Sequence, residues 1–375
     1  MGQHACGMLH IMSRVNDPII INGKTIKNRL TMAPTVKFDF AGEDGKLTLK
    51  HLVHYLERSE GGIGLICVEA TAVTPEGRFA KNHLGLWEDA QIEEHKRVNE
   101  SCHMTDRVVL IQLNHTCITG NPMFGTPVGP SSMPTRDGKM SIEMSVDEIH
   151  AMQESFRSAA VRAREAGYDG IQLHGCHGYL INQFVSPKTN LRTDEYGENK
   201  AFFGKEIIQG IREKCGKDFI ISVRTPGAEP DVQHAVDVAK EYVEAGCDYL
   251  QISHGIDSFS VKLKDDSEPY SDLCALGVNF HKVFGKCKKQ GSQEPVSIPI
   301  SCVGGLLTPE RVRYIIENDL ADTVDLARAM LADPQFPNAV LNGASYIKCF
   351  ECQRCQYGPG TGHNCPAEIK RKKQI

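Results

Sequence analysis

Short apolar runs recur along the whole chain and alternate with stretches of helical, amphipathic periodicity. Each run is almost continuously apolar, as expected of parallel strands buried on both faces. The runs are residues 30–34, 64–70, 108–115, 170–175, 219–225, 249–255, 299–304 and 323–329. The clearest helical stretches between them are residues 148–166, 203–214, 235–245 and 310–318. Eight strand–helix alternations predict an α/β fold, the (β/α)8 TIM barrel. An open doubly wound sheet is the alternative, but no Gly-x-Gly-x-x-Gly follows any strand.

Local motifs place several boundaries of these elements. Ser145-Val146-Asp147-Glu148 is a capping box, and Thr308-Pro309 places an N-cap before a proline that begins a helix. Asn22-Gly23 predicts the turn of a hairpin within residues 18–29, which we expect to close the bottom of the barrel. We therefore divide the chain into a barrel over residues 1–340 and a Cys-rich C-terminal extension over residues 341–375.

Composition excludes several classes of protein. The chain of 375 residues has a formal net charge of −5, which argues against a nucleic-acid-binding face. No apolar run reaches the roughly 18 residues of a membrane span, and residues 1–13 do not resemble a secretory signal. Ten of the 14 cysteines are scattered singly, so we expect reduced thiols and a cytoplasmic protein. The basic residues 370–373 are interpreted as a solvated tail.

Active sites of such barrels lie at the carboxyl ends of the strands, where this chain carries small, polar and basic residues. The candidates at these ends are Ala33, Pro34, Thr35, Ala70, Gln112, Arg224, Gly304, Gly305, Ala327 and Arg328. Loops after the last two strands commonly hold phosphate, which suits Gly304-Gly305 and Arg328. Gln112 and Arg224 suit the edge of a planar heterocycle. Each interpretation has an alternative. Gly304-Gly305 would be a turn and Arg328 an ordinary surface residue, whereas Gln112 and Arg224 would be a buried polar pair that donates hydrogen bonds to loop carbonyls.

The fourth strand ends in the most distinctive group, His174, His177 and Tyr179. Two imidazoles can bind a metal or donate hydrogen bonds to a carbonyl oxygen, and a neutral tyrosine can donate a proton. A metal site would need a further ligand, for which Asp194 and His254 are the candidates, although they lie downstream or on another strand. We expect the catalytic residues to be these two histidines and Tyr179.

Several motifs together resemble one family. Residues 174–184 (HGCHGYLINQF) and 186–197 (SPKTNLRTDEYG) are similar to the active-site region of the old yellow enzyme family of flavin-dependent ene-reductases. Further matches occur in the same order: Lys27-Asn28-Arg29, residues 61–65 (GGIGL), Gln112-Leu113-x-His115 and Ala332-Asp333-Pro334. The resemblance implies FMN across the barrel mouth, with Ala33, Pro34, Thr35, Ala70, Gln112 and Arg224 at the flavin ring and Gly304, Gly305, Ala327 and Arg328 at its phosphate.

The resemblance also implies a reaction. A nicotinamide, NADH or NADPH, reduces the flavin, and hydride then passes to the β-carbon of an α,β-unsaturated carbonyl compound. His174 and His177 would bind the carbonyl oxygen, and Tyr179 would protonate the α-carbon. The alternatives are a dehydrogenase or demethylase of the same barrel family, an electron-transfer partner subunit, and a ligand-binding protein without turnover. We expect an enone or enoyl substrate and a homo-oligomer.

Some positions depart from the family pattern. Val36 stands where relatives often carry Cys or Thr, Cys117-Ile118 where His-x-Gly-Arg is usual, and Glu198 where a second glycine is usual. Residues 114–141 form a long loop that we interpret as a lid or substrate wall.

The other four cysteines lie close together near the C-terminus, at Cys349, Cys352, Cys355 and Cys365. Four thiolates at such spacing can hold a [4Fe–4S] cluster or a zinc ion. The third alternative is that the four cysteines are the remnant of such a site and bind no metal. The segment resembles the cluster-binding stretch of dienoyl-CoA reductases, with tighter spacing. A relay through such a cluster would require an electron-donor protein as partner.

Overall fold

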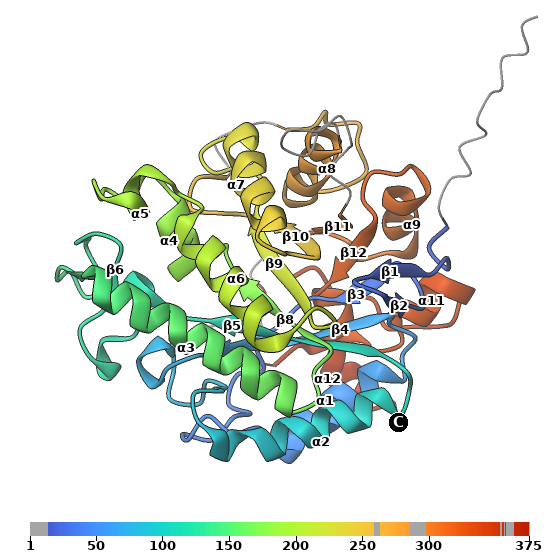
Figure 1. The fold of residues 1–375 in the computed structure, drawn as a ribbon. Helices are drawn as coiled ribbons and strands as arrows, with labels where there is room; N and C mark the ends of the chain where they lie inside the picture. Colours follow the sequence, from blue (N-terminus) through green and yellow to red (C-terminus); the bar gives the residue numbers. More distant parts are fainter. Residues whose placement is uncertain are drawn as a thin grey trace, which may run out of the picture.

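The computed structural model describes residues 14–258, 263–285, 298–352, 355, 357 and 364–374. Eight parallel strands form a closed barrel in the order β10-β11-β12-β3-β4-β5-β8-β9, with helices outside it (Figure 1). The strands are β3 (Leu30–Met32), β4 (Leu65–Ala72), β5 (Val108–Asn114), β8 (Gly170–His174), β9 (Ile220–Pro226), β10 (Tyr249–Ser253), β11 (Ile300–Val303) and β12 (Thr323–Leu326). The predicted TIM barrel and its eight strands are confirmed.

The helices begin where the sequence places their caps. The Ser145 side chain accepts from the Glu148 N–H at the start of α3 (Val146–Glu165), and Thr308 caps α9 (Pro309–Glu317) in the same way. The other helices are α1 (Leu49–Ser59), α2 (Ile92–His103), α4 (Leu180–Val185), α5 (Glu195–Glu198), α6 (Phe202–Cys215), α7 (Val232–Glu244), α8 (Asp272–Phe284), α10 (Arg328–Ala332), α11 (Phe336–Asn342) and α12 (Pro366–Lys372).

The predicted hairpin is formed by β1 (Ile19–Ile21) and β2 (Lys24–Ile26). Asn22 and Gly23 both have positive φ (45° and 76°), as the tight turn between twisted strands requires. Ile21 and Ile26 pack in one small apolar cluster with residues of the barrel strands, Leu65, Cys67, Leu110, Ile220 and Tyr249. Since most of these strand residues lie near the amino ends of their strands, the hairpin closes that end of the barrel, as expected.

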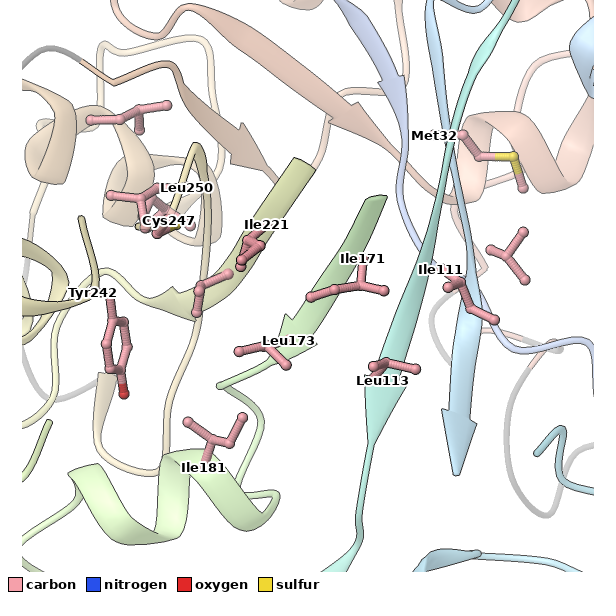
Figure 2. Close-up of a cluster of buried hydrophobic side chains, with 14 of the residues drawn as sticks. Met32, Ile111, Leu113, Ile171, Leu173, Ile181, Ile221, Tyr242, Cys247 and Leu250 are labelled. Atoms are coloured by element: carbon pink, nitrogen blue, oxygen red, sulfur yellow. The ribbon is translucent and has the colours of Figure 1, made fainter. Parts of the chain in front are cut away.

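The larger core lies between the strands and the surrounding helices. Ile111, Ile171 and Ile221 are paired across neighbouring strands, and Figure 2 shows them side by side. The residues that follow them, Gln112 and Gln172, project to the opposite face because side chains alternate along a strand. This alternation carries polar side chains into the barrel interior and toward its carboxyl end.

Two segments lie outside the strand–helix alternation of the barrel, the long loop after β5 and the C-terminal helix. The long loop after β5 contains two short paired strands, β6 (Val128–Gly129) and β7 (Ile142–Glu143). Of the basic residues 370–373, interpreted as a solvated tail, the three lysines are exposed as expected, but residues 370–372 form the end of α12 and the half-buried Arg371 places Nη2 3.1 Å from Glu57 Oε2 of α1. Within the described residues, no helix has the length and apolar character of a membrane span.

Candidate active site

The loop after β8 is held by hydrogen bonds to the ends of the next two strands. The Gly175 N–H donates to the Arg224 carbonyl (2.8 Å), and the His177 N–H donates to the His254 carbonyl (3.1 Å). His177 has a φ of 63°, a left-handed conformation that His adopts more readily than most residues. Asn182 Oδ1 then accepts from the Gly178 N–H (2.8 Å). The loop therefore has a fixed shape that directs both histidines to one place.

The two histidines contact each other at the barrel mouth. His174 Nε2 lies 3.0 Å from His177 Nδ1, and His177 Nε2 lies 2.8 Å from Ser253 Oγ of β10. Burial lowers the pKa of His174 and of His177 well below 6.5, and the Arg224 guanidinium lowers both pKa values further. Both imidazoles are therefore neutral at physiological pH, so each has one N–H to donate.

Tyr179 stands beside this pair, at the N-terminus of α4. Its ring centroid is 4.7 Å from that of His174, in an edge-to-face arrangement. Burial raises the pKa of the Tyr179 hydroxyl above 10, so it keeps its proton at neutral pH. The structure thus brings together the three residues predicted as catalytic and leaves all three as neutral hydrogen-bond donors.

Below this group lies a layer of buried polar side chains. Arg224 is paired in register with His174, and Gln112 Nε2 donates to Gln172 Oε1 (2.6 Å). Two buried donors of this region, Gln172 Nε2 and Arg224 Nε, have no protein partner. Unsatisfied buried polar groups are rare and costly. A heterocycle with carbonyl and ring-nitrogen acceptors, such as flavin, fits these donors.

A cavity of about 260 Å³ opens beside the histidines. Its lining includes His177, Arg224, Ser253, His254, Leu273, Gly304, Gly305, Asp325, Ala327 and Arg328. Gly304 and Gly305 have positive φ (122° and 63°), and a Cβ on either would lie within 3 Å of Leu273 or Ser271. Only glycine fits there, which leaves backbone N–H groups accessible to an anion. The predicted phosphate residues therefore line one cavity and fit the phosphate of FMN.

The remaining predicted ring residues lie at neighbouring strand ends but do not line this cavity. The Ala33 N–H donates to Leu326 O (3.0 Å), which places the end of β3 beside Ala327. Thr35 Oγ1 donates to Ala33 O (3.2 Å), and the carbonyl of Ala70 lies 2.8 Å from His83 Nε2. Pro34 lies between Ala33 and Thr35, on the segment that leads from β3 toward α1.

The four C-terminal cysteines line a second, much smaller cavity of about 20 Å³. Cys365 is the N-cap of α12, and the other three precede it in the chain. Arg328 lines both this cavity and the one beside the histidines, so the two are neighbours. Tyr357 also lines the cysteine cavity, and its hydroxyl donates to the Val36 carbonyl (2.7 Å) beyond β3. The extension is thus attached to the segment expected at the flavin ring.

Several site residues were not identified from the sequence. Ser253 orients His177 by the hydrogen bond to Nε2. Because Ser253 is a polar residue at the carboxyl end of a strand, the sequence could have identified it as a site residue. Asp325 lies at the centre of the barrel, where Oδ1 accepts from Gln251 Nε2 (2.7 Å) and Ser301 Oγ (3.0 Å), and no local motif marks it. His254, considered as a metal ligand, has its ring centroid 4.3 Å from that of His177. Asp194 is not part of the site, because its carboxylate pairs with Arg192.

Comparisons with known proteins agree with this geometry. The NADH:flavin oxidoreductase / NADH oxidase family matches residues 15–345. An NADPH dehydrogenase from Bacillus pumilus is 34% identical over 334 residues, covering 87% of this chain and 93% of the relative.

Solved structures share the fold. An old yellow enzyme homologue from Zymomonas mobilis has a TM-score of 0.74 at 25% identity, covering 90% of this chain and 95% of that one. A 2-naphthoyl-CoA reductase has a TM-score of 0.81 at 24% identity over 91% of this chain, and the match spans only 54% of that longer protein.

Proposed function

The chain belongs to the NADH:flavin oxidoreductase / NADH oxidase family, and from this premise we propose that it reduces the C=C bond of α,β-unsaturated carbonyl compounds with NAD(P)H. It is an NAD(P)H:flavin oxidoreductase of the old yellow enzyme type. Ene-reduction, its substrate class and the roles of individual residues are the proposal.

One observation carries this choice of reaction. His174 and His177 lie 3.0 Å apart, with Tyr179 packed against His174 at the barrel mouth. Burial keeps both imidazoles neutral, so each carries one N–H, and a carbonyl oxygen would replace the hydrogen bond between them, with one ring changing tautomer so that both donate to it. Two donors on one oxygen stabilise the negative charge that develops there during alkene reduction. The Tyr179 hydroxyl keeps its proton for the α-carbon.

The residues around the cavity would hold FMN, which supplies the hydride chemistry when bound. Gly304, Gly305, Ala327 and Arg328 would bind the phosphate, and Gln112 and Arg224 would contact the ring edge, with Ala33, Pro34, Thr35 and Ala70 along the ring. The two unpartnered buried donors below the histidines, Gln172 Nε2 and Arg224 Nε, support this placement. Ser253 would keep His177 in position while the carbonyl oxygen is bound.

Anaerobic stopped-flow spectroscopy tests the proposed reaction. We expect NAD(P)H to bleach the flavin absorbance of the purified protein and 2-cyclohexenone to restore it, with cyclohexanone as the product. Saturated cyclohexanone is the matched control and should leave the bleached protein unchanged. Bleaching by NAD(P)H without recovery by any enone would contradict ene-reduction, while the family assignment would stand.

We further propose that Cys349, Cys352, Cys355 and Cys365 hold a [4Fe–4S] cluster. Four thiols around one cavity are the donor set that such a cluster needs. The cavity shares Arg328 with the proposed phosphate site, so the cluster would lie next to the cofactor. An extension that begins near residue 341 would then serve as an electron entry point for a donor protein.

Chemical analysis decides between iron, zinc and no metal at these cysteines. Anaerobically purified protein should contain about four iron and four acid-labile sulfide atoms per chain. The Cys352→Ser variant should lose most of both, whereas Cys247→Ser, a change at a buried cysteine away from the cavity, should lose neither. Stoichiometric zinc, or the absence of any metal, would refute the cluster.

A further inference from the structure

Three potential metal ligands converge at the end of β8. His174, Cys176 and His177 each place one ligand atom within 4.8 Å of the other two. The sequence indicated only Asp194 or His254 as a further ligand for the two histidines, whereas the structure provides the Cys176 thiol from the same loop. Cys176 is fully buried, and no residue role proposed above uses it.

The shape of the loop explains the convergence. Residues 174 and 176 would lie on one face of a continuing strand, and 177 on the other. The left-handed conformation of His177 (φ 63°) turns the chain, so that its ring returns to within 3.0 Å of His174 Nε2. The buried side chains of the loop therefore share one small volume.

The surroundings of the three groups resemble those of metal ligands. A metal-bound histidine usually bonds through its other ring nitrogen to an oxygen that fixes its orientation. His177 Nε2 has such a partner in Ser253 Oγ, 2.8 Å away. Burial raises the pKa of the Cys176 thiol to about 12, although the Arg224 guanidinium in contact with it lowers this pKa in part, so the convergence of the three groups, and not a preformed thiolate, points to a metal site.

We propose that His174, Cys176 and His177 bind one soft divalent cation, such as Zn²⁺, which competes with the carbonyl substrate. Two nitrogens and one thiolate suit zinc and leave a fourth, open position. Zinc would bind the two nitrogens that now face each other, and the Cys176 thiol would release its proton to solvent. Since the same histidines are proposed to bind the carbonyl oxygen, the ion and the substrate exclude each other. The metal site goes beyond the proposed function, but the competition rests on it.

Equilibrium dialysis against Zn²⁺ tests the site without any turnover. The wild-type protein should bind one more zinc per chain than Cys176→Ala or Cys176→Ser. Cys247→Ala is the matched control, because it also removes a buried thiol, and it should bind as much zinc as wild type. Cys355→Ala controls for zinc at the C-terminal cysteines. Equal zinc in the wild type and both Cys176 variants would overturn the proposed metal site.

Competition is measured separately, with 4-hydroxybenzaldehyde as a carbonyl-bearing phenol probe. Zinc should raise the apparent Kd of this probe in the wild type. In the Cys176 variants, the zinc concentration that produces the same rise in apparent Kd should be at least ~10-fold higher. A zinc effect that disappears in Cys355→Ala, and persists in Cys176→Ala, would instead assign it to the extension. If the probe binds but enones are not reduced, ene-reduction fails while the metal site remains supported by dialysis.

Discussion

Replacing Tyr179 with phenylalanine removes the proposed proton donor and little else. The phenyl ring retains the edge-to-face packing on His174, at a centroid distance of 4.7 Å, so substrate affinity should stay the same. A positioned acid contributes ~10²–10⁴-fold to a rate. Tyr179 is only partly buried, so water can reach its place. We therefore expect the lower end, a loss of about 10²-fold, which corresponds to about 3 kcal/mol.

The assay separates the two halves of the reaction. In anaerobic stopped-flow experiments, the reduction of Tyr179→Phe by NAD(P)H should match the wild type, and its reoxidation by 2-cyclohexenone should be slow. Tyr242→Phe is the matched control, because it removes another buried tyrosine hydroxyl, one without a hydrogen-bond partner, from a residue of the hydrophobic core (Figure 2). That control should behave as wild type in both half-reactions.

Two results would refute the role of Tyr179. Equal losses in reduction and reoxidation would mean that the variant disturbs the site as a whole. Unchanged reoxidation would mean that the α-carbon takes its proton from another source. A selective loss of reoxidation, with an unchanged Kd for a phenol probe, is the expected outcome.

Three further predictions concern other parts of the molecule. The rate of reoxidation by enones should be flat between about pH 7 and 9, because the histidine pKa values lie below 6.5 and that of Tyr179 above 10; a sigmoidal change near pH 8 would contradict this. Gly304→Ala should weaken FMN binding by ~1–3 kcal/mol, since φ is 122° and the new Cβ would lie 2.7 Å from Leu273 Cβ; titration by flavin fluorescence measures it, and an unchanged Kd would refute the phosphate assignment. Tyr357→Phe should lower the free energy of unfolding by ~1 kcal/mol through the lost bond to Val36, measured by urea denaturation; no change would mean that this contact does not stabilise the extension.

The architecture could be predicted from local pattern alone. Apolar runs of strand length, alternating with amphipathic helices, have few compact arrangements, and a parallel sheet repeated eight times closes into a barrel. Helix starts at Ser145 and Thr308 and the turn at Asn22-Gly23 follow from short-range hydrogen bonds and backbone preferences, which a few residues suffice to specify. The grouping of His174, His177 and Tyr179, which we propose to be catalytic, could be predicted for the same reason, since the three share one loop.

Contacts between distant segments required the tertiary structure. Ser253 and Arg224 reach the histidines because β8, β9 and β10 are neighbours in the barrel, a register that no local motif encodes. In the basic stretch 370–373 the three lysines are exposed, as expected, but Arg371 pairs with Glu57 of α1, over 300 residues away. Cys176 becomes a potential ligand only through the backbone turn at His177. The sequence by itself thus determined the barrel and the loop that carries the proposed catalytic residues, whereas packing between segments far apart in the chain decided which side chains surround them.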